Sequence, residues 1–422
     1  MIAPNENSQY YGLGFSVFNH NLSLPRHRWF EFKEGFSETL VLEAIRERTT
    51  YKRRPRILDP FAGSGTTLVT AGRQRLSATG IEVNPFLAFA SKAKCTPNGW
   101  KPGPFSKRFS QIMRDSRSEK ASHLEGLSTF TERAGLESWL FNRSVLRGFV
   151  SIDDALINAG RYRLPLRLAL LAALTDCCNA KRDGKCLRYR KDWQSLGFTS
   201  GDLRQAFERR ARIVLEDIKG YDFSPDGLQV LKGDARKVLR NLGSRTHDLV
   251  VTSPPYLNSF DYSDVYRPEM FVGNFVNTNQ DLRRIRLRTI RSHVQVSWQP
   301  ERSIVSALLH PVLKQIRRRQ LWDDRLPDMV QSYFFDMAQI LSELNRILKY
   351  GGQAWIVVSS SAYGGVEIPV DLILADVASR QGWKLRDVHV LRQLRSAGQQ
   401  WSRLRKRAKP PLRESLVILE KQ

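Results

Sequence analysis

The stretch Thr252-Ser253-Pro254-Pro255-Tyr256 follows the apolar run Asp248 to Val251, which is typical of a short buried strand. The two prolines end that strand, because Pro255 keeps Pro254 out of the helical region and neither proline can donate to a β-ladder. The pentapeptide is therefore a rigid turn that presents a hydroxyl, backbone carbonyls and a tyrosine ring. It lies at the carboxyl end of a strand, the edge at which open α/β sheets bind their ligands.

The residue types in this turn suit a reaction at an exocyclic amino group of a nucleobase. The lone pair of such a nitrogen is delocalised into the ring until two acceptors draw its N–H groups out of the ring plane. The Ser253 hydroxyl and the Pro254 carbonyl can be those acceptors, and the Tyr256 ring can stack on an extruded base. A turn of this kind can also simply close a strand, so the rest of the chain decides.

The composition points to a polyanionic partner. The chain has 422 residues, 41% of them hydrophobic, and a formal net charge of +25. Its length allows two or three domains, and its charge favours nucleic acid as the partner, with a membrane surface as the rival. The longest apolar segment, Leu164 to Cys178, contains Arg167 and Asp176, so we expect a buried helix and no membrane span.

The sequence shows neither the pattern of a signal peptide nor the cysteine spacing of a metal site. The N-terminal sequence MIAPNENSQYY lacks the basic start and apolar core of a signal peptide. Cys95, Cys177, Cys178 and Cys186 do not form paired C-x-x-C spacings, and no cysteine lies in a turn suited to a covalent nucleophile. We expect a reduced, cytoplasmic protein without a bound metal.

A second motif has the pattern strand, glycine turn, helix start. It is RILDPFAGSGTT at residues 56–67, where the backbone can approach a cofactor closely. It lacks the lysine of a phosphate loop and the third glycine of a dinucleotide fingerprint. Asp59, Glu82 and Asp234 each stand at the end of a strand-like run. Three carboxylates there suit a nucleoside cofactor that carries a positive sulfonium and no phosphate.

Together these segments resemble the amino-methylating DNA methyltransferases, which make N4-methylcytosine or N6-methyladenine. DPFAGSGTT (59–67) resembles motif I of that family, GIEVNP (80–85) motif II, GDA (233–235) motif III and TSPPY (252–256) motif IV. The aromatic segment HRWFEFKEGFS (27–37) is similar to motif X, which packs beside the methionine part of the cofactor in that family. The resemblance covers residues 27–95, 226–262 and roughly 330–420.

The resemblance implies S-adenosylmethionine as cofactor. The implied cofactor-binding residues are Asp59, Phe61, Gly63, Gly65, Glu82 and Asp234, and a flipped base would be held by Ser253, Pro254, Pro255 and Tyr256. It also implies the class I methyltransferase fold, an α/β fold with a mixed seven-stranded sheet and helices on both faces. The matching elements of the second half are helices at 332–348 and 370–380 and strands at 354–358, about 384–391 and about 415–420.

The expected organisation has three parts. Residues 1–95 contain the N-terminal segment and the cofactor-binding half, residues 96–225 a mainly helical insertion, and residues 226–422 the catalytic half. The insertion falls between motifs II and III, where none of the family's usual orders puts a recognition domain, so its role stays open. Its candidate helices are 136–146, 151–159, 164–178 and 202–219.

A basic insertion at 257–326 follows the catalytic turn directly. Its arginines, interleaved with Trp298 and Trp322, are either a solvated helix face or a surface that grips phosphates and stacks on bases. The candidate nucleic-acid-binding residues are Arg283, Arg284, Arg286, Arg288 and Arg291. A further basic run, Arg403 to Lys409 with Trp401, could line the same cleft. Asn258, Asp261 and Tyr262 either orient the base or cap a helix.

The expected function is methylation of a flipped base in double-stranded DNA. Serine at the first position of the tetrapeptide favours N4 of cytosine, since adenine enzymes of the family more often carry Asp or Asn there. The alternatives are an N6-adenine DNA methyltransferase, an RNA base methyltransferase and a catalytically silent nucleic-acid-binding subunit. Whether a restriction or defence-system partner exists stays open.

Overall fold

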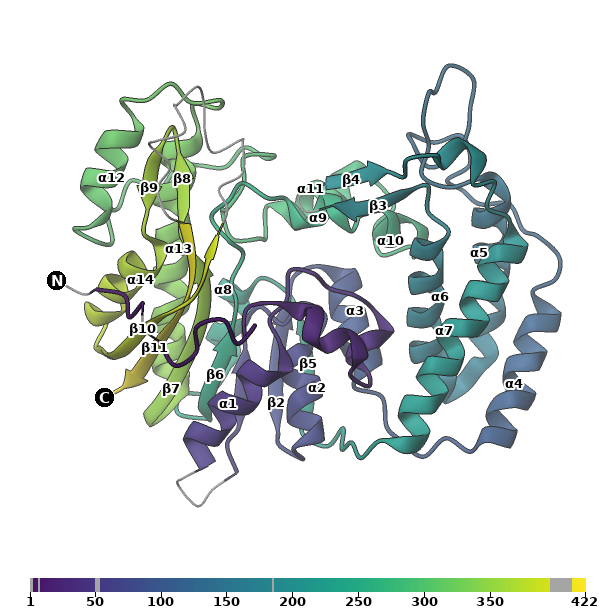
Figure 1. Cartoon of the computed structure of the whole chain (residues 1–422), viewed down its shortest axis with the longest axis horizontal. Coiled ribbons are helices and arrows are strands. Elements are labelled where there is room, and N and C mark those ends of the chain that lie inside the picture. The colour runs from purple at the N-terminus through teal and green to yellow at the C-terminus, as the bar shows by residue number, and fades with distance from the viewer. Residues whose placement is uncertain (1–2, 7, 50–53, 184–185, 395–411) are drawn as a thin grey trace.

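The computed structural model describes residues 3–6, 8–49, 54–183, 186–394 and 412–422. It contains a seven-stranded sheet with the strand order β10-β11-β7-β6-β1-β2-β5 (Figure 1). In that order the strands are Trp383–Leu394, Leu412–Lys421, Leu348–Ser359, His247–Thr252, Ile57–Asp59, Ala78–Glu82 and Leu228–Lys232. All neighbouring strands are parallel except for β11, which runs antiparallel to both β10 and β7. This confirms the mixed seven-stranded sheet of the class I methyltransferase fold.

Both faces of the sheet are covered by helices, as the continuous apolar run of β6 predicts. Leu249 and Val251 face one hydrophobic core, and Val250 between them faces the other. The first core also contains residues of α1 and α2, and the second contains residues of α8, α13 and α14. These helices are α1 (Glu38–Thr49), α2 (Thr66–Arg73), α8 (Ala235–Val238), α13 (Leu326–Ile347) and α14 (Val370–Ser379).

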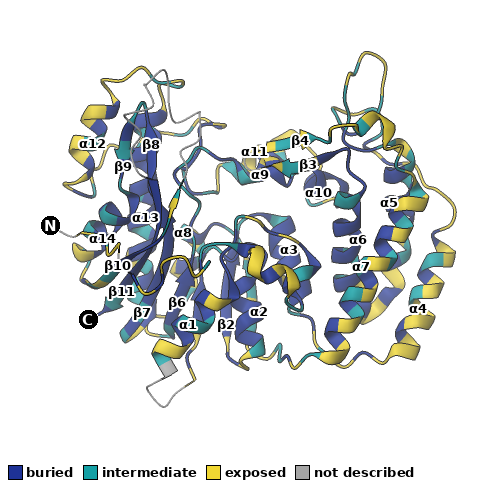
Figure 2. Cartoon of the chain, in the orientation of Figure 1, coloured by how far each residue is buried: buried dark blue, intermediate teal, exposed yellow. Residues whose placement is uncertain are grey.

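The insertion at 96–225 follows α3 (Pro85–Lys94) and is mainly helical. Its helices are α4 (Pro102–Asp115), α5 (Arg143–Ala155), α6 (Arg163–Asp176) and α7 (Ser200–Gly220). Helix α6 is the buried helix predicted at 164–178, and it packs against α7 and α3. Figure 2 shows α6 mostly in the buried colour and α4 with a broad exposed face. The insertion is thus joined to the sheet through α3.

Other elements of the insertion differ from the prediction. One helix, α5, replaces the two predicted at 136–146 and 151–159, and it runs into the 3-10 helix Leu156–Tyr162, where Gly160 has φ 58°. Helix α4 was not predicted, because Pro102-Gly103-Pro104 resembles a break. Proline is nevertheless favourable in the first turn of a helix, where the amide has no intrahelical partner. The antiparallel hairpin of β3 (Ala180–Asp183) and β4 (Cys186–Tyr189) was also missed.

The basic insertion after the catalytic turn connects two cores. Its helices are α9 (Tyr262–Val265), α10 (Arg267–Val272), α11 (Asn279–Arg286) and α12 (Leu309–Ile316). Met270 and Phe271 of α10 belong to the core that contains α3 and α6, whereas Leu309 and Leu313 of α12 pack with α13. The segment between them must therefore cross from the helical insertion to the sheet.

The remaining elements are short. A hairpin of β8 (Ser361–Tyr363) and β9 (Val366–Ile368) precedes α14, and the other 3-10 helices are Phe18–Ser23, His27–Trp29, Trp193–Ser195 and Leu239–Asn241. None of the described helices is both long and apolar enough to cross a membrane. The basic run Arg403 to Lys409 with Trp401 lies outside the described residues.

Candidate active site

The predicted catalytic turn lies where the strand pattern places it, directly after β6 at the carboxyl edge of the parallel strands. Residues Ser253 to Tyr256 have no regular secondary structure. Thr252, the last residue of β6, donates from its hydroxyl to Oδ1 of Asp59 at 2.7 Å. Since Asp59 ends β1, this buried hydrogen bond fixes the turn beside the motif I loop.

A cavity with an empty volume of about 1040 Å³, part of it open to solvent, lies at this edge. The predicted site residues that line it are Phe61, Gly63, Glu82, Asp234, Ser253, Pro254 and Pro255, and Arg288 lines it as well. Asp59, Gly65 and Tyr256 are not part of its lining. The structure therefore brings motifs I to IV to one cavity, and the roles of the individual residues stay predictions.

Glu82 stands at the end of β2 and lines the cavity. Its Oε2 accepts from the Gly63 amide at 2.8 Å and its Oε1 accepts from the Asn84 amide at 2.7 Å. Burial raises the pKa of Glu82 to about 7, although these amide hydrogen bonds oppose the shift. Each carboxylate oxygen has a second lone pair, so Glu82 can still accept from a hydroxyl donor in the cavity.

Asp59 is buried behind the wall of the cavity. Its Oδ2 accepts from the Thr67 hydroxyl at 2.7 Å, and its Oδ1 accepts from Thr252 and from the Phe61 amide at 3.1 Å. Burial raises its pKa to about 6. Gly65 also shapes the wall: its φ is 91°, and a Cβ there would lie 2.5 Å from the Ser91 hydroxyl. Both residues position the loop on which the lining residues stand.

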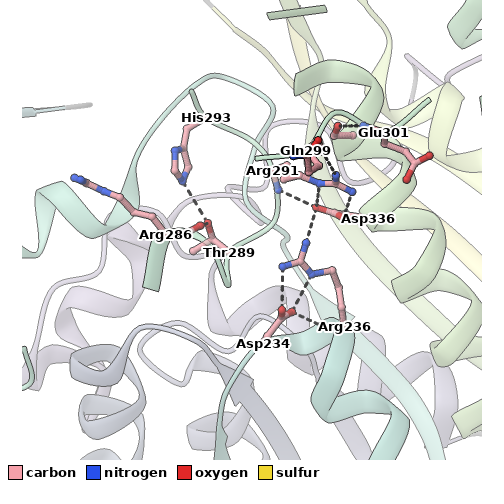
Figure 3. Close-up of polar contacts among 10 residues, drawn as sticks. Asp234, Arg236, Arg286, Thr289, Arg291, His293, Gln299, Glu301 and Asp336 are labelled. Carbon is pink, nitrogen blue, oxygen red and sulfur yellow. Dashed lines mark hydrogen bonds and ion pairs between the residues drawn. The ribbon is translucent and has the colours of Figure 1, made fainter. Parts of the chain in front are cut away.

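Asp234 belongs to a network of acids and arginines (Figure 3). Asp234 caps α8 and forms an ion pair with Arg236 at 2.9 Å. Arg236 also pairs with Oδ2 of Asp336 at 2.9 Å, and Arg291 pairs with Oδ1 of Asp336 at 2.7 Å. The network links the cavity wall to α13 and to the basic insertion. The guanidinium of Arg291 is thus paired with a buried carboxylate of the protein itself and does not face a nucleic acid.

The five predicted nucleic-acid-binding arginines fall into two groups. Arg286 pairs with Asp261 at 2.6 Å and has a side chain that is 19% exposed, so it resembles Arg291 in being engaged internally. The exposed members are Arg283, Arg284 and Arg288, of which Arg284 pairs with Asp281 on the surface. Only this exposed group can reach a polyanion without breaking a buried ion pair.

Tyr256 is half-buried beside the cavity. Its hydroxyl is hydrogen-bonded to the side chains of Ser253 and Glu414, and burial raises its pKa well above the ordinary value. Glu414 in β11 accepts in turn from Nε of Arg392 at 2.5 Å. The tyrosine is therefore protonated and held by its polar end.

The aromatic segment packs beside motif I. A Cβ on Gly63, whose φ is 51°, would lie 2.6 Å from the ring of Phe32. Lys94 joins the same two segments, because its buried Nζ donates to the Phe30 carbonyl and to the Ser64 hydroxyl, both at 3.2 Å. Burial lowers the pKa of Lys94 to about 7.

Sequence reasoning missed several residues of the lining. Glu34 accepts from the Tyr266 hydroxyl at 2.6 Å, and burial raises its pKa. It lies with Lys33 in a turn closed by the Gly35 amide, which donates to the Phe32 carbonyl at 3.1 Å. His293 is buried with its Nε2 3.3 Å from the Thr289 hydroxyl, and nothing in the sequence pointed to it. Asp261 caps α9 and also lines the cavity, so its role in orienting a base stays a prediction.

The chemistry of the lining fits S-adenosylmethionine. Phe32, Phe36 and Phe61 provide an apolar surface, and the carboxylates of Glu34 and Glu82 suit ribose hydroxyls and a positive sulfonium. Within the described residues, no group of three His, Cys, Asp or Glu side chains could hold a metal ion.

Comparison with known proteins shows likeness over nearly the whole chain. No protein-family model matches it. The Type II methyltransferase M.AvaI of Nostoc sp. is 26% identical over 411 residues, covering 89% of this chain and 82% of that protein. The Type II methyltransferase M.BsoBI of Geobacillus stearothermophilus is 26% identical over 449 residues, covering 96% and 86%.

Among solved structures, the rRNA methyltransferase aviRa from Streptomyces viridochromogenes covers 91% of this chain and 83% of its own, with 12% identity and a TM-score of 0.29. That likeness is weak, so the fold assignment rests on the strand order and strand directions of the sheet itself. The relatives match nearly the full length of this chain, and motifs I to IV meet at one cavity on this sheet. Over that length the chain is therefore similar to Type II DNA methyltransferases.

Proposed function

We propose that this protein methylates the exocyclic N4 of a cytosine that is flipped out of duplex DNA. The observation that carries the proposal is that Ser253 and Pro254 line the same cavity as Phe61, Glu82 and Asp234. Methyl donor and target base would therefore meet without any movement between separate sites. When bound there, S-adenosylmethionine supplies a methyl group made electrophilic by its sulfonium.

The turn supplies the acceptors that make the amino group nucleophilic. The Ser253 hydroxyl has one proton and two lone pairs, so it can donate to Tyr256 and still accept from the base. Because Tyr256 is itself held by Glu414, this series of hydrogen bonds would aim a lone pair of Ser253 at the amino group. The Pro254 carbonyl accepts the second N–H. The nitrogen loses one proton to water after the methyl is attached, so no side-chain base is required.

The choice of base follows from Ser253, because serine at this position favours cytosine through the family resemblance. N6-adenine is the alternative target in the same mechanism. An RNA base methyltransferase and a silent nucleic-acid-binding subunit are the alternatives that change the function.

The test is to incubate the purified protein with isotope-labelled S-adenosylmethionine and either mixed-sequence duplex DNA or structured RNA, and to identify the labelled nucleosides by mass spectrometry. We expect label in N4-methylcytosine from DNA, and its loss in Ser253→Ala. Label in N6-methyladenine would overturn the choice of base, and label only in RNA would overturn the choice of polymer. Binding of S-adenosylmethionine without transfer to either polymer would identify a silent subunit.

A further inference from the structure

The hairpin of β3 and β4 is a two-faced ribbon. Its burial alternates along both strands, so that Ala180, Arg182, Leu187 and Tyr189 face the protein and Lys181, Asp183, Cys186 and Arg188 face outward. In the antiparallel register Lys181 stands directly opposite Arg188. The outward face therefore presents two cations side by side.

The inward face fixes this ribbon to the rest of the site. Arg182 forms an ion pair with the buried carboxylate of Glu269, and its Cζ lies 4.6 Å from the centre of the Tyr266 ring. Arg190, just after β4, donates from Nε to the Cys178 carbonyl at 2.8 Å. These contacts come from both insertions, so the ribbon is held in place and is not a free loop.

The outward cations oppose the stability of the ribbon. Like charges directly opposite each other destabilise an antiparallel pair, and a two-stranded hairpin is only marginally stable on its own. Arg188 has a partner in Asp183 at 2.8 Å, but both side chains are largely exposed, so the pair contributes little. The exposed Lys33 lies beside the ribbon, with its Nζ 3.5 Å from the Arg182 carbonyl. Such a surface is best explained by a polyanion that binds to it.

The ribbon lies close to the candidate active site. In the segment at 30–34, Phe32 and Glu34 line the main cavity, while Phe30 and Lys33 line a second cavity together with Lys181 and other residues of the ribbon. The segment at 30–34 thus separates the main cavity from the second cavity beside the ribbon. Strand β4 also contacts α9, which begins six residues after the catalytic turn's tyrosine, and Figure 1 shows β3 and β4 next to α9.

We propose that the outward face of the β3–β4 ribbon grips the phosphate backbone of duplex DNA beside the extruded base, with Lys181 and Arg188 as the phosphate contacts. The inference rests on the proposed function in one respect, namely that DNA is the polyanion. It assigns DNA contact to the insertion at 96–225, whose role the motif order leaves open.

The first test compares two double variants. Lys181→Ala/Arg188→Ala removes the outward cations. Arg46→Ala/Lys384→Ala is the matched control, because Arg46 is also exposed and paired with a nearby carboxylate, and Lys384 is exposed at the start of β10, on the edge of the sheet opposite the cavity. With ~0.9 of salt slope per phosphate contact, the ribbon variant should flatten the slope of log affinity against log salt by about 1.8, and the control should not. Equal slopes in both variants would overturn the inference.

The second test uses the wild-type protein, so it does not depend on how a variant folds. Cys186 is exposed on the outward face of the ribbon, whereas Cys177 and Cys178 are buried and burial raises the pKa of the half-buried Cys95 to about 12. Maleimide should therefore modify Cys186 first. The control is Cys186→Ser, which should lose this rapid reaction. Saturating duplex DNA should slow modification of Cys186 at least several-fold.

The outcomes separate the inference from the proposed function. If DNA binds and is methylated while Cys186 stays fully reactive, the ribbon is not a DNA contact and the proposed function stands. If the protein binds and methylates only RNA, and only RNA protects Cys186, then DNA is the wrong polymer in both the proposed function and the ribbon proposal. Protection by DNA together with the flattened slope supports the ribbon contact.

Discussion

The Gly63 amide donates a 2.8 Å hydrogen bond to Oε2 of Glu82, and this contact ties the motif I loop to the acid of motif II. Glu82 therefore has two functions at the end of β2. It shapes the loop through the amides of Gly63 and Asn84, and it presents a carboxylate to the cavity. Substitutions at this position should affect cofactor binding more than the sheet, because the side chain lines the cavity at the last residue of β2.

For Glu82→Ala we expect a ten- to hundredfold loss of S-adenosylmethionine affinity. The change removes a charge-assisted acceptor for a ribose hydroxyl, which is worth about 1.5–3 kcal/mol. Calorimetric titration measures the affinity, and thermal unfolding checks that the protein is folded. Wild-type affinity in a folded Glu82→Ala protein would remove Glu82 from the cofactor site.

The affinity for S-adenosylmethionine should also depend on pH near neutrality. Burial raises the pKa of Glu82 to about 7, and hydroxyl donors bind the ionised carboxylate more strongly. Affinity should therefore rise with pH up to about 7 and level off above it, with at most about tenfold per pH unit on the acidic side. Glu82→Gln, which cannot ionise, should bind more weakly at pH 8 but with a flat profile. A wild-type profile that stays flat between pH 6 and 8 would contradict this.

The same pKa shift has the opposite effect on the stability of the protein without cofactor. Cofactor affinity should rise with pH, whereas the free energy of unfolding should fall. The folded state holds the proton of Glu82 more tightly than the unfolded state, whose pKa is near 4.5. The Glu82 contribution to the free energy of unfolding is therefore fully present below pH 4.5 and is lost as pH rises through about 7. Chemical denaturation of wild type and Glu82→Gln across this range should show the difference shrinking at low pH.

The elements that the sequence predicted and those it missed differ in how local their signals are. Strand β6 is an apolar run stopped by two prolines, and Glu82, Asp234 and Ser253 meet because the carboxyl ends of parallel strands share one edge. The β3–β4 hairpin was missed because its short strands carry charges where a strand pattern would show apolar residues. The partner of Arg291 is 45 residues away, so its ion pair could not be read from local sequence.

Tyr256 can be tested with two substitutions that separate its ring from its hydroxyl. Tyr256→Ala removes the stacking surface, which is worth ~1–3 kcal/mol for a base, and we expect most of the methylation rate to be lost with little change in cofactor affinity. Tyr256→Phe keeps the ring but breaks the hydrogen bonds with Ser253 and Glu414. The Tyr256→Phe protein should still bind the base but methylate it more slowly, since the Ser253 hydroxyl is no longer oriented towards the amino group of the base. Single-turnover kinetics measures both, and wild-type turnover of Tyr256→Ala would show that the turn is only structural.

The arginines of the basic insertion should separate according to their partners. Arg283→Ala/Arg284→Ala/Arg288→Ala removes only exposed cations. If all three contact phosphates at ~0.9 each, the salt slope of DNA binding should flatten by two to three units for all sequences alike.

Arg286→Ala is the matched control for this triple variant. It leaves Asp261 buried without its partner, so it should lower stability in denaturant unfolding and leave the salt slope unchanged. A triple variant with the wild-type slope would exclude these arginines as the gripping surface. The β3–β4 ribbon would then be the better candidate.

Asp336 offers a test of the network that joins the cavity wall to the basic insertion. Its side chain is 2% exposed and pairs with both Arg236 and Arg291. Asp336→Ala would remove the buried carboxylate that these two guanidinium groups share. Arg236 would keep its ion pair with Asp234. Removing one partner of a buried ion pair costs about 3–5 kcal/mol.

Asp328 provides the control for Asp336, because it lies on the same helix α13 and pairs with Arg317 at 3.6 Å, but its side chain is 42% exposed. Asp328→Ala should change the free energy of unfolding by no more than about 1 kcal/mol. Urea unfolding of both variants gives the comparison. Since Arg236 also holds Asp234, we further expect Asp336→Ala to weaken S-adenosylmethionine binding, whereas Asp328→Ala should not. Equal unfolding free energies for the two variants would mean that the buried network does not stabilise the wall of the active site.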